Sequence, residues 1–305
     1  MSADTASVRS VPAEALRSPG PSFLGVVRGE LLKLSRQRAL WALLAGGTLL
    51  LVVTGLALLT TGDLETRYKA SHESFFANTF DILGALFNTG SGIVLLLSAA
   101  RLFGMEYSGG TIRILLARGV GRLQLYLAKL VALAVLGAGL LVGFTAIAGA
   151  MIAIAIQSWT GSIGGLTSLP PVSVELLKVI LLVALVSVGV TVLLGSTAAI
   201  LGRSLSFGMA VAMGFFPADN FGTLILFILQ RVTHNDAILK VSAYLLGPNL
   251  NVLVSLLEPG LKLRPIFASP LVTVSAAHAW TVVGVYSAVF LAGSVLLLVR
   301  RDVLE

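Results

Sequence analysis

The side chains that could carry out chemistry are few, and the sequence does not gather them in one place. The three histidines, His72, His234 and His278, are far apart and have no HxxxH spacing, so solvated or interfacial histidines are expected rather than a metal site. The chain has no cysteine, which excludes thiolate catalysis, disulfides and cysteine-ligated metals. Catalysis needs acid–base or nucleophilic groups close together. The sequence therefore predicts no catalytic residues, no metal and no cofactor bound by this chain.

A nucleotide-binding site is also not recognisable. The nearest approach to a phosphate-binding loop is GSTAAILGRS, from Gly195 to Ser204. Its glycine spacing differs from that of GxxxxGK[ST], and the lysine that would reach the phosphates is missing. If ATP energises this protein, the nucleotide is expected to bind to a separate chain.

The composition indicates an integral membrane protein. Of its 305 residues, 56% are hydrophobic and 11% are charged, with a mean hydropathy of +0.96. Soluble domains have about a quarter of their residues charged. Several apolar stretches exceed about 18 residues, long enough to cross a bilayer as helices. The net charge of +7 is attributed to basic loops that orient these helices and not to nucleic-acid binding.

The expected fold is all-α and polytopic, with six transmembrane helices in a single membrane domain over residues 22–305. The predicted spans are 39–61, 82–100, 130–156, 176–201, 207–230 and 277–299. Residues 1–21, rich in Ser, Ala and Pro, are predicted to be a disordered cytoplasmic tail. Residues 231–270 are expected to form an external segment with short helices that lie on the membrane surface or dip into it, the first of them capped by Asp236. An even number of spans, with basic residues concentrated on one side, places both termini in the cytoplasm.

The segment from Ser22 to Arg38 is predicted to be an amphipathic interfacial helix. Leu24, Val27, Leu31 and Leu34 recur at the spacing of one helical face. The remaining surface is largely charged and includes Glu30, Lys33 and Arg36. Such a helix is expected in the membrane interface, with its cations near anionic head groups. A cytosolic helix that packs on a partner is the competing interpretation.

Polar residues within the predicted spans are the candidates for a transport pathway. Pro217 interrupts the fifth span and is followed closely by Asp219 and Asn220, while Asn88 lies in the less apolar second span. These three polar residues are the candidate pathway residues. For Asp219, a helix-end cap exposed to water is the favoured alternative.

The segment 101–129 is a basic, polar loop between two predicted spans and is expected to face the cytoplasm. Within it, Ser108 or Thr111 is expected to cap a short helix whose Ile112, Leu115 and Leu116 share one face. Gly119 and Gly121 are expected to end this helix and turn the chain back into the bilayer. A short rigid protrusion with an apolar ridge and neighbouring arginines is predicted, which is more than a plain orienting loop requires.

This arrangement resembles the membrane subunit of type-2 ATP-binding-cassette (ABC) transporters, the exporter permeases of the bacitracin- and lantibiotic-resistance kind. The resemblance rests on Glu106, the Gly110–Thr111 pair, the Leu115–Leu116 pair, and a Gly/Arg turn before a span that begins at Lys129. The N-terminal segment Glu30-Leu-Leu-Lys33, the six spans and the long external segment agree with it. Glycine stands where the family often has proline in the turn, which does not change the expected role of the turn.

The resemblance implies that the short helix is a coupling helix seated in a groove of a separate ATPase subunit. Glu106 and Arg113 would make polar contacts and Leu115 and Leu116 the apolar contact; the other implied coupling residues are Gly110, Thr111, Ile112, Arg118 and Arg122. Orientation of the spans alone is the competing explanation for the arginines. Two ATPase subunits, which bind ATP and Mg, would drive a homodimer or heterodimer of permeases in the plasma membrane to export a small amphipathic molecule.

Two other function classes stay open at this point. An ion-coupled secondary transporter normally has more charge within its spans than this chain has. A membrane-embedded enzyme would need the clustered reactive groups that the sequence lacks. A permease that serves metal-site maturation, or lipid or polysaccharide handling, is a neighbouring interpretation.

Overall fold

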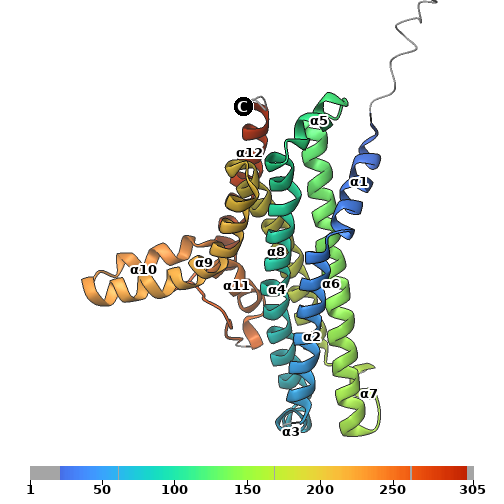
Figure 1. The fold of residues 1–305 in the computed structure, drawn as a ribbon. Helices are drawn as coiled ribbons and strands as arrows, with labels where there is room; N and C mark the ends of the chain where they lie inside the picture. The colour runs from blue at the N-terminus through green and yellow to red at the C-terminus, as the bar shows by residue number, and fades with distance from the viewer. Residues whose placement is uncertain (1–20, 61, 168, 262, 301–305) are drawn as a thin grey trace, which may run out of the picture.

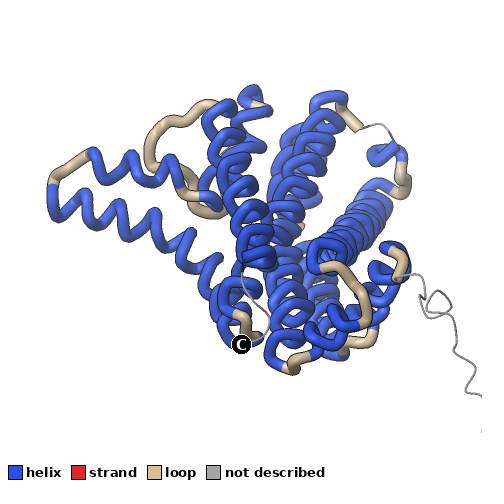
Figure 2. Tube along the Cα trace, turned by 90° about the horizontal axis from the view of Figure 1, so that it is seen from above, coloured by secondary structure: helices blue, strands red, loops and turns tan. Residues whose placement is uncertain are grey.

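A computed structural model describes residues 21–60, 62–167, 169–261 and 263–300 of the chain as an elongated helical bundle (Figure 1). The long helices are α2 (Arg38–Thr60), α4 (His72–Ser108), α6 (Arg122–Thr160), α8 (Pro171–Gly202), α9 (Leu205–Thr233) and α12 (Ala276–Arg300). The short ones are α1 (Phe23–Ser35), α3 (Asp63–Ala70), α5 (Thr111–Ala117), α7 (Gly164–Thr167), α10 (Ala237–Val241), η2 (Ser242–Tyr244), α11 (Leu246–Leu257) and η3 (Pro259–Leu261). All regular structure in these ranges is helical (Figure 2). Residues 1–20 of the predicted tail lie outside the described residues.

The prediction of an all-α polytopic membrane protein is confirmed. Among the described residues, five helices are long and apolar enough to cross a bilayer without a break: α2, α4, α6, α8 and α12. Two bent pairs can each add a span, because α9 bends by 45° near Asp219 and the α10–η2 segment meets α11 at 79°. The count is therefore five to seven. The predicted number of six corresponds to counting α9 as one span and α10–α11 as none.

The helices on either side of the basic segment are much longer than the predicted spans. The structure corrects the prediction that residues 101–129 form a loop, because α4 continues to Ser108 and α6 begins at Arg122. With 37 and 39 residues, α4 and α6 extend for roughly 55 Å each at 1.5 Å per residue. A hydrocarbon core is only about 30 Å thick. Both helices therefore project beyond the bilayer, and α5 lies at the end where they meet (Figure 1).

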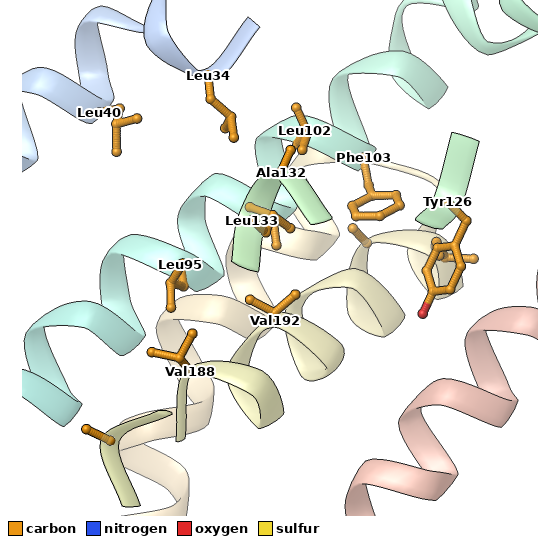
Figure 3. Packing of buried hydrophobic residues seen from close by; sticks show 14 of the residues in the cluster. Leu34, Leu40, Leu95, Leu102, Phe103, Tyr126, Ala132, Leu133, Val188 and Val192 are labelled. Atoms are coloured by element: carbon orange, nitrogen blue, oxygen red, sulfur yellow. The ribbon is translucent and has the colours of Figure 1, made fainter. Parts of the chain in front are cut away.

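The principal core lies where α4 packs between α6 and α8 (Figure 3). Leu95 and Ala99 of α4 and Leu133 of α6 belong to this cluster, and all three are fully buried. Leu34 of α1 and Leu40 of α2 belong to the same cluster, so the N-terminal segment is part of the bundle. A partly buried hydrogen-bonded group joins α8 to α12, because the Thr197 hydroxyl lies 2.9 Å from the Phe290 carbonyl oxygen and 2.8 Å from the Ser294 hydroxyl.

The far end of the bundle is closed by aromatic side chains. Residues 62–81, which lie between the first two predicted spans, form α3 and the first turns of α4. This makes an aromatic cluster possible, in which Tyr68 packs edge-on against Phe75 and Phe76 and also contacts Trp159 of α6. Edge-on aromatic pairs add about 0.5–1.5 kcal/mol beyond the area they bury. The cluster fixes the ends of α4 and α6 opposite α5.

Glycine at position 104 lets α9 begin directly against α4. A Cβ atom at Gly104 would lie 2.7 Å from the Leu205 Cα and 2.9 Å from the Leu205 amide nitrogen, which are backbone atoms that cannot rotate away. We expect Gly104→Ala to lower the free energy of unfolding by about 1–3 kcal/mol, the usual effect of overpacking. Gly90→Ala, on the same helix and with nothing within 4 Å, is the matched control. Equal unfolding midpoints for the two variants in detergent would contradict this packing.

The segment between α9 and α12 contains the predicted short helices, with one difference in their capping. The Asp236 side chain makes no capping hydrogen bond; the Asn235 Oδ1 atom accepts one from the Ala237 amide instead. Asp236 accepts a hydrogen bond from the Gln230 side chain. The capping prediction for Asp236 was therefore wrong by one residue. The next helix, α11, ends at Leu257, directly before Glu258-Pro259-Gly260.

Candidate functional site

The short helix α5 stands at the end of the α4–α6 pair, and glycines make both of its turns. Gly110 precedes it with φ of +65° and Gly119 follows it with φ of +84°, a left-handed conformation that glycine adopts at no steric cost. The prediction that Ser108 or Thr111 caps α5 was wrong. The Ser108 hydroxyl accepts a hydrogen bond from the Leu205 amide of α9, and Thr111 is already the first helical residue.

The apolar side of α5 faces the protein itself. Ile112 is buried in a small cluster with Val120 and Leu125, and Leu115 and Leu116 pack half-buried against that cluster. The predicted ridge therefore exists, but it anchors α5 to its own chain. A partner can touch the other side, where Arg113, Ile114 and Arg118 are exposed.

Beneath α5, four charged residues from three helices form a network of ion pairs. The Lys129 ammonium of α6 lies 2.8 Å from Glu30 Oε2 of α1 and 2.9 Å from Glu106 Oε1 of α4. The Lys33 ammonium lies 2.6 Å from Glu30 Oε1 and 2.6 Å from Glu106 Oε1. We call these four residues the ion network. Its two cations and two carboxylates balance, as burial requires.

Most of the ion network is shielded from solvent. Glu30 and Lys129 are each 2% exposed and Glu106 is 7% exposed. Lys129 also donates to the Leu102 carbonyl and lies 5.5 Å from the centre of the Phe103 ring. Burial alone lowers the pKa of Lys33, but its hydrogen bonds and charge interactions with Glu106 and Glu30 outweigh that effect, so the pKa of Lys33 is raised.

The ion network corrects two predictions for α1. The buried residues of this helix are Val27, Glu30 and Leu34, whereas Leu24 is exposed, so the inward face is rotated from the predicted one. Glu30 and Lys33 point to α4 and α6 instead of a lipid surface, although Arg36 is exposed as predicted. α1 is a packed part of the bundle.

Glu106 is also in a different environment from the one expected of a polar coupling contact. Its Oε1 atom forms ion pairs with both Lys33 and Lys129, and its Oε2 atom is buried. A carboxylate so enclosed cannot reach a soluble partner. One signal in the sequence pointed to this arrangement: Lys129 is followed directly by the apolar run of α6, and a cation at such a position needs a carboxylate nearby.

The last predicted coupling residue, Arg122, joins α6 to the end of α12. Its guanidinium donates a hydrogen bond of 3.1 Å to the Leu298 carbonyl oxygen. Orientation of the spans does not require such a contact, so this arginine has a structural role as well as a charge.

The candidate pathway residues do not converge in the described structure. The Asp219 carboxylate accepts a hydrogen bond from the Gly247 amide in the first turn of α11, the position where a helix favours negative charge. Asn88 lines a separate cavity of about 30 Å³ beside Asn251, and its Oδ1 atom is buried without a hydrogen-bond partner among the described residues. The side chain of Asn220 lies outside the described residues. A pathway through these residues stays a prediction.

Metal-ligating groups are likewise dispersed. The described part of the chain contains no cluster of three or more His, Asp or Glu side chains suited to a metal. His278 lies 2.8 Å from the Ala243 carbonyl oxygen, and His72 packs edge-on against Tyr68. These contacts are structural.

One comparison with known proteins agrees with this geometry. Residues 26–218, more than half of the chain, match the model of a family described as ABC-2 family transporter protein. The match begins within α1 and ends at the bend of α9, so it covers the ion network and α5. No curated protein matches the sequence. With its apolar helices and its protruding α5, the chain belongs to the ABC-2 family as a membrane-spanning permease of an ABC transporter.

Proposed function

We propose that this chain couples ATP hydrolysis on a separate ATPase subunit to the export of a small amphipathic molecule, with α5 as the coupling helix. The main support for this proposal is the exposed side of α5. Arg113, Ile114 and Arg118 offer an apolar side chain between two cations at the outermost point of the α4–α6 pair. Interfaces typically combine such a desolvated apolar anchor with a polar rim.

The attachment of α5 to the bundle supports force transmission. α5 is joined to α4 and α6 by short turns and is seated on the cluster around Ile112. The ion network then joins α4 and α6 to α1 directly below it. A displacement of α5 by an ATPase would therefore move α1, α4 and α6 together, as in a rigid-body or hinge transition.

The proposed topology places α5 in the cytoplasm of a multi-pass plasma-membrane protein. The start of α1, the end of α12 and α5 all lie at one end of the bundle (Figure 1). Arg28, Arg36, Arg118, Arg203 and Arg300 belong to segments at this end. Such an excess of cations is typical of the cytoplasmic side, which supports the proposal that both termini lie there.

The proposed assembly contains two permease subunits, identical or different, and two ATPase subunits that bind ATP and Mg. The sequence resemblance alone supports the proposal of export of the bacitracin- and lantibiotic-resistance kind. Membership of a transport-subunit family favours this function over an ion-coupled carrier or a membrane enzyme.

The test is reconstitution of the tagged chain with the ATPase encoded beside it. We expect a complex of two permeases and two ATPases by native mass spectrometry, and ATPase activity that rises in lipid with an amphipathic substrate. An ATPase that binds the chain only through a segment other than α5, or no ATPase binding at all, would overturn the coupling assignment.

A further inference from the structure

The small cavity beside Asn88 lies in the half of the bundle away from α5. It is enclosed by α4, α8, α11 and residues 265–267. Its α4 residues belong to the first half of that helix, which begins beside α3 at the end opposite α5 (Figure 1). With α5 in the cytoplasm, as proposed above, this cavity lies in the outer half of the membrane domain.

Three side chains supply the polar atoms of this cavity, and all of them can offer an oxygen to a ligand. Asp81 and Asn88 are seven residues apart on α4 and therefore lie on one face of the helix. Asn251 lines the cavity from α11, and its amide nitrogen donates a hydrogen bond of 2.8 Å to the Ala268 carbonyl oxygen. The side-chain oxygen of Asn251 is then the atom left for a ligand.

The protein does not satisfy the two acceptors on α4. The Oδ1 atom of Asn88 is buried without a hydrogen-bond partner among the described residues. Asp81 is half-buried, and within the described part of the chain no cation and no hydrogen-bond donor contacts its carboxylate. Buried polar atoms are almost always satisfied, and a buried charge needs an opposite charge. The cavity therefore requires a hydrogen-bond donor that carries a positive charge.

The size and the remaining wall of the cavity restrict that donor. A volume of about 30 Å³ holds roughly two water-sized groups, so only a compact group fits. The rest of the wall is apolar apart from Gly84 and Ala85, and consists of Ile180, Leu250, Val254, Pro265, Ile266 and Phe267. Calcium takes about six to eight oxygen ligands, more than these three side chains supply. An ammonium group has three N–H bonds, which matches the three oxygens.

We propose that this cavity binds a primary ammonium group. Its N–H bonds would be donated to the Asp81 carboxylate, Asn88 Oδ1 and Asn251 Oδ1, and its charge would balance Asp81. The carbon chain attached to the nitrogen would lie against the apolar wall. An aminophospholipid and an amphipathic amine in transit both carry such a group. The second source rests on the proposed export function and would place an amine on the exported molecule.

Two cations that differ at the nitrogen test the assignment. Butylamine, protonated at pH 7, and butyltrimethylammonium have the same charge and the same alkyl chain, but only the first has N–H donors. Binding to the full-length permease in detergent is measured by isothermal titration calorimetry. No ATPase is present, so the result is independent of the proposed coupling function. We expect butylamine to bind at least tenfold more tightly and sodium ions not to displace it.

Two substitutions in the cavity are compared with one outside it. Asp81→Asn keeps the size of the side chain and should weaken butylamine binding at least tenfold, because a charged hydrogen bond is lost. Asn88→Leu removes an oxygen that no described residue uses and should weaken binding about three- to tenfold. Glu73→Gln, which removes an exposed carboxylate from the first turn of α4, is the control and should bind as the parent does.

Competition distinguishes the two sources of the ammonium group. Displacement of butylamine by phosphatidylethanolamine, but not by phosphatidylcholine with the same acyl chains, would assign the site to a lipid. An amphipathic amine that stimulates the ATPase activity of the complete transporter, but not of its Asp81→Asn variant, would assign it to the exported molecule. Either result supports the ammonium site.

Several results would overturn the proposal. These are no binding of butylamine, equal binding of the two cations, displacement by an equal concentration of sodium ions, and unchanged affinity in Asp81→Asn. An equal loss of affinity in Glu73→Gln would also do so, because it would show a general effect of surface charge. Butylamine binding by a permease that binds no ATPase would instead contradict only the coupling function.

Discussion

Lys129→Met is expected to lower the free energy of unfolding by about 3–5 kcal/mol, the usual effect of removing one partner from a buried ion pair. The variant keeps the volume of the side chain but leaves Glu30 and Glu106, both more than nine-tenths buried, with only Lys33 to balance them. Lys33 is half-exposed and lies at the edge of the ion network. Equilibrium unfolding of the purified chain in mixed micelles measures the change.

Lys178→Met is the matched control for this prediction. Lys178 pairs with Glu175 at 2.7 Å, but both side chains are more than 60% exposed. Such surface pairs contribute about 0–1 kcal/mol. A Lys129 variant no less stable than the Lys178 variant would show that the ion network contributes little to folding.

A compensating variant tests whether unbalanced charge causes the loss of stability in Lys129→Met. Glu30→Gln combined with Lys129→Met removes one charge of each sign and leaves the Lys33–Glu106 pair in place. We expect this double variant to recover at least half of the stability lost by Lys129→Met. A loss equal to the sum of the two single substitutions would mean that packing, and not charge balance, determines the effect.

Ile114→Asp is expected to weaken association with the ATPase at least tenfold while leaving the stability of the permease unchanged. Ile114 is 54% exposed and lies between Arg113 and Arg118 on the outer side of α5. A carboxylate at this position adds nothing unfavourable to the isolated chain, but it would be desolvated in an apolar contact with a partner. Copurification and substrate-stimulated ATPase activity measure the effect.

Two further variants distinguish a loss of ATPase binding from a loss of folding stability. Ile163→Asp changes an isoleucine of equal exposure, 52%, beyond the opposite end of α6 and should bind the ATPase normally. Leu116→Asp places a carboxylate against Ile112 and Leu125, so it should lower stability as well as binding. Normal copurification and export in Ile114→Asp would exclude the outer side of α5 as the contact.

Several features of the molecule could be predicted because they depend on short stretches of sequence. Apolar runs of about 20 residues identify the membrane helices, since only helices satisfy the backbone in lipid. Gly119 marked the turn after α5 because few other residues adopt its left-handed conformation. The apolar spacing of Ile112, Leu115 and Leu116 predicted one face of a short helix, which the structure contains.

The errors at Glu30, Lys33 and Glu106 share one physical cause, which is that a charged residue looks solvent-exposed until its partner is known. Lys129 and Glu30 are 99 positions apart, so no periodicity joins them, and each alone is typical of a basic loop or a polar helix face. The same limit applies to α4 and α6, whose polar ends were interpreted as loops although tertiary contacts keep them helical.

The sequence alone determined the class of this protein, the approximate helices and the presence of a protrusion between two of them, because hydropathy and turn residues act locally. Only the tertiary structure decided which side of that protrusion, helix α5, is exposed to a partner. It turned Leu115 and Leu116 inward and Ile114 outward, since the cluster around Ile112 buries the nearer face. It also brought Glu30, Lys33, Glu106 and Lys129 together beneath α5, because buried charges must find opposite charges wherever the chain places them.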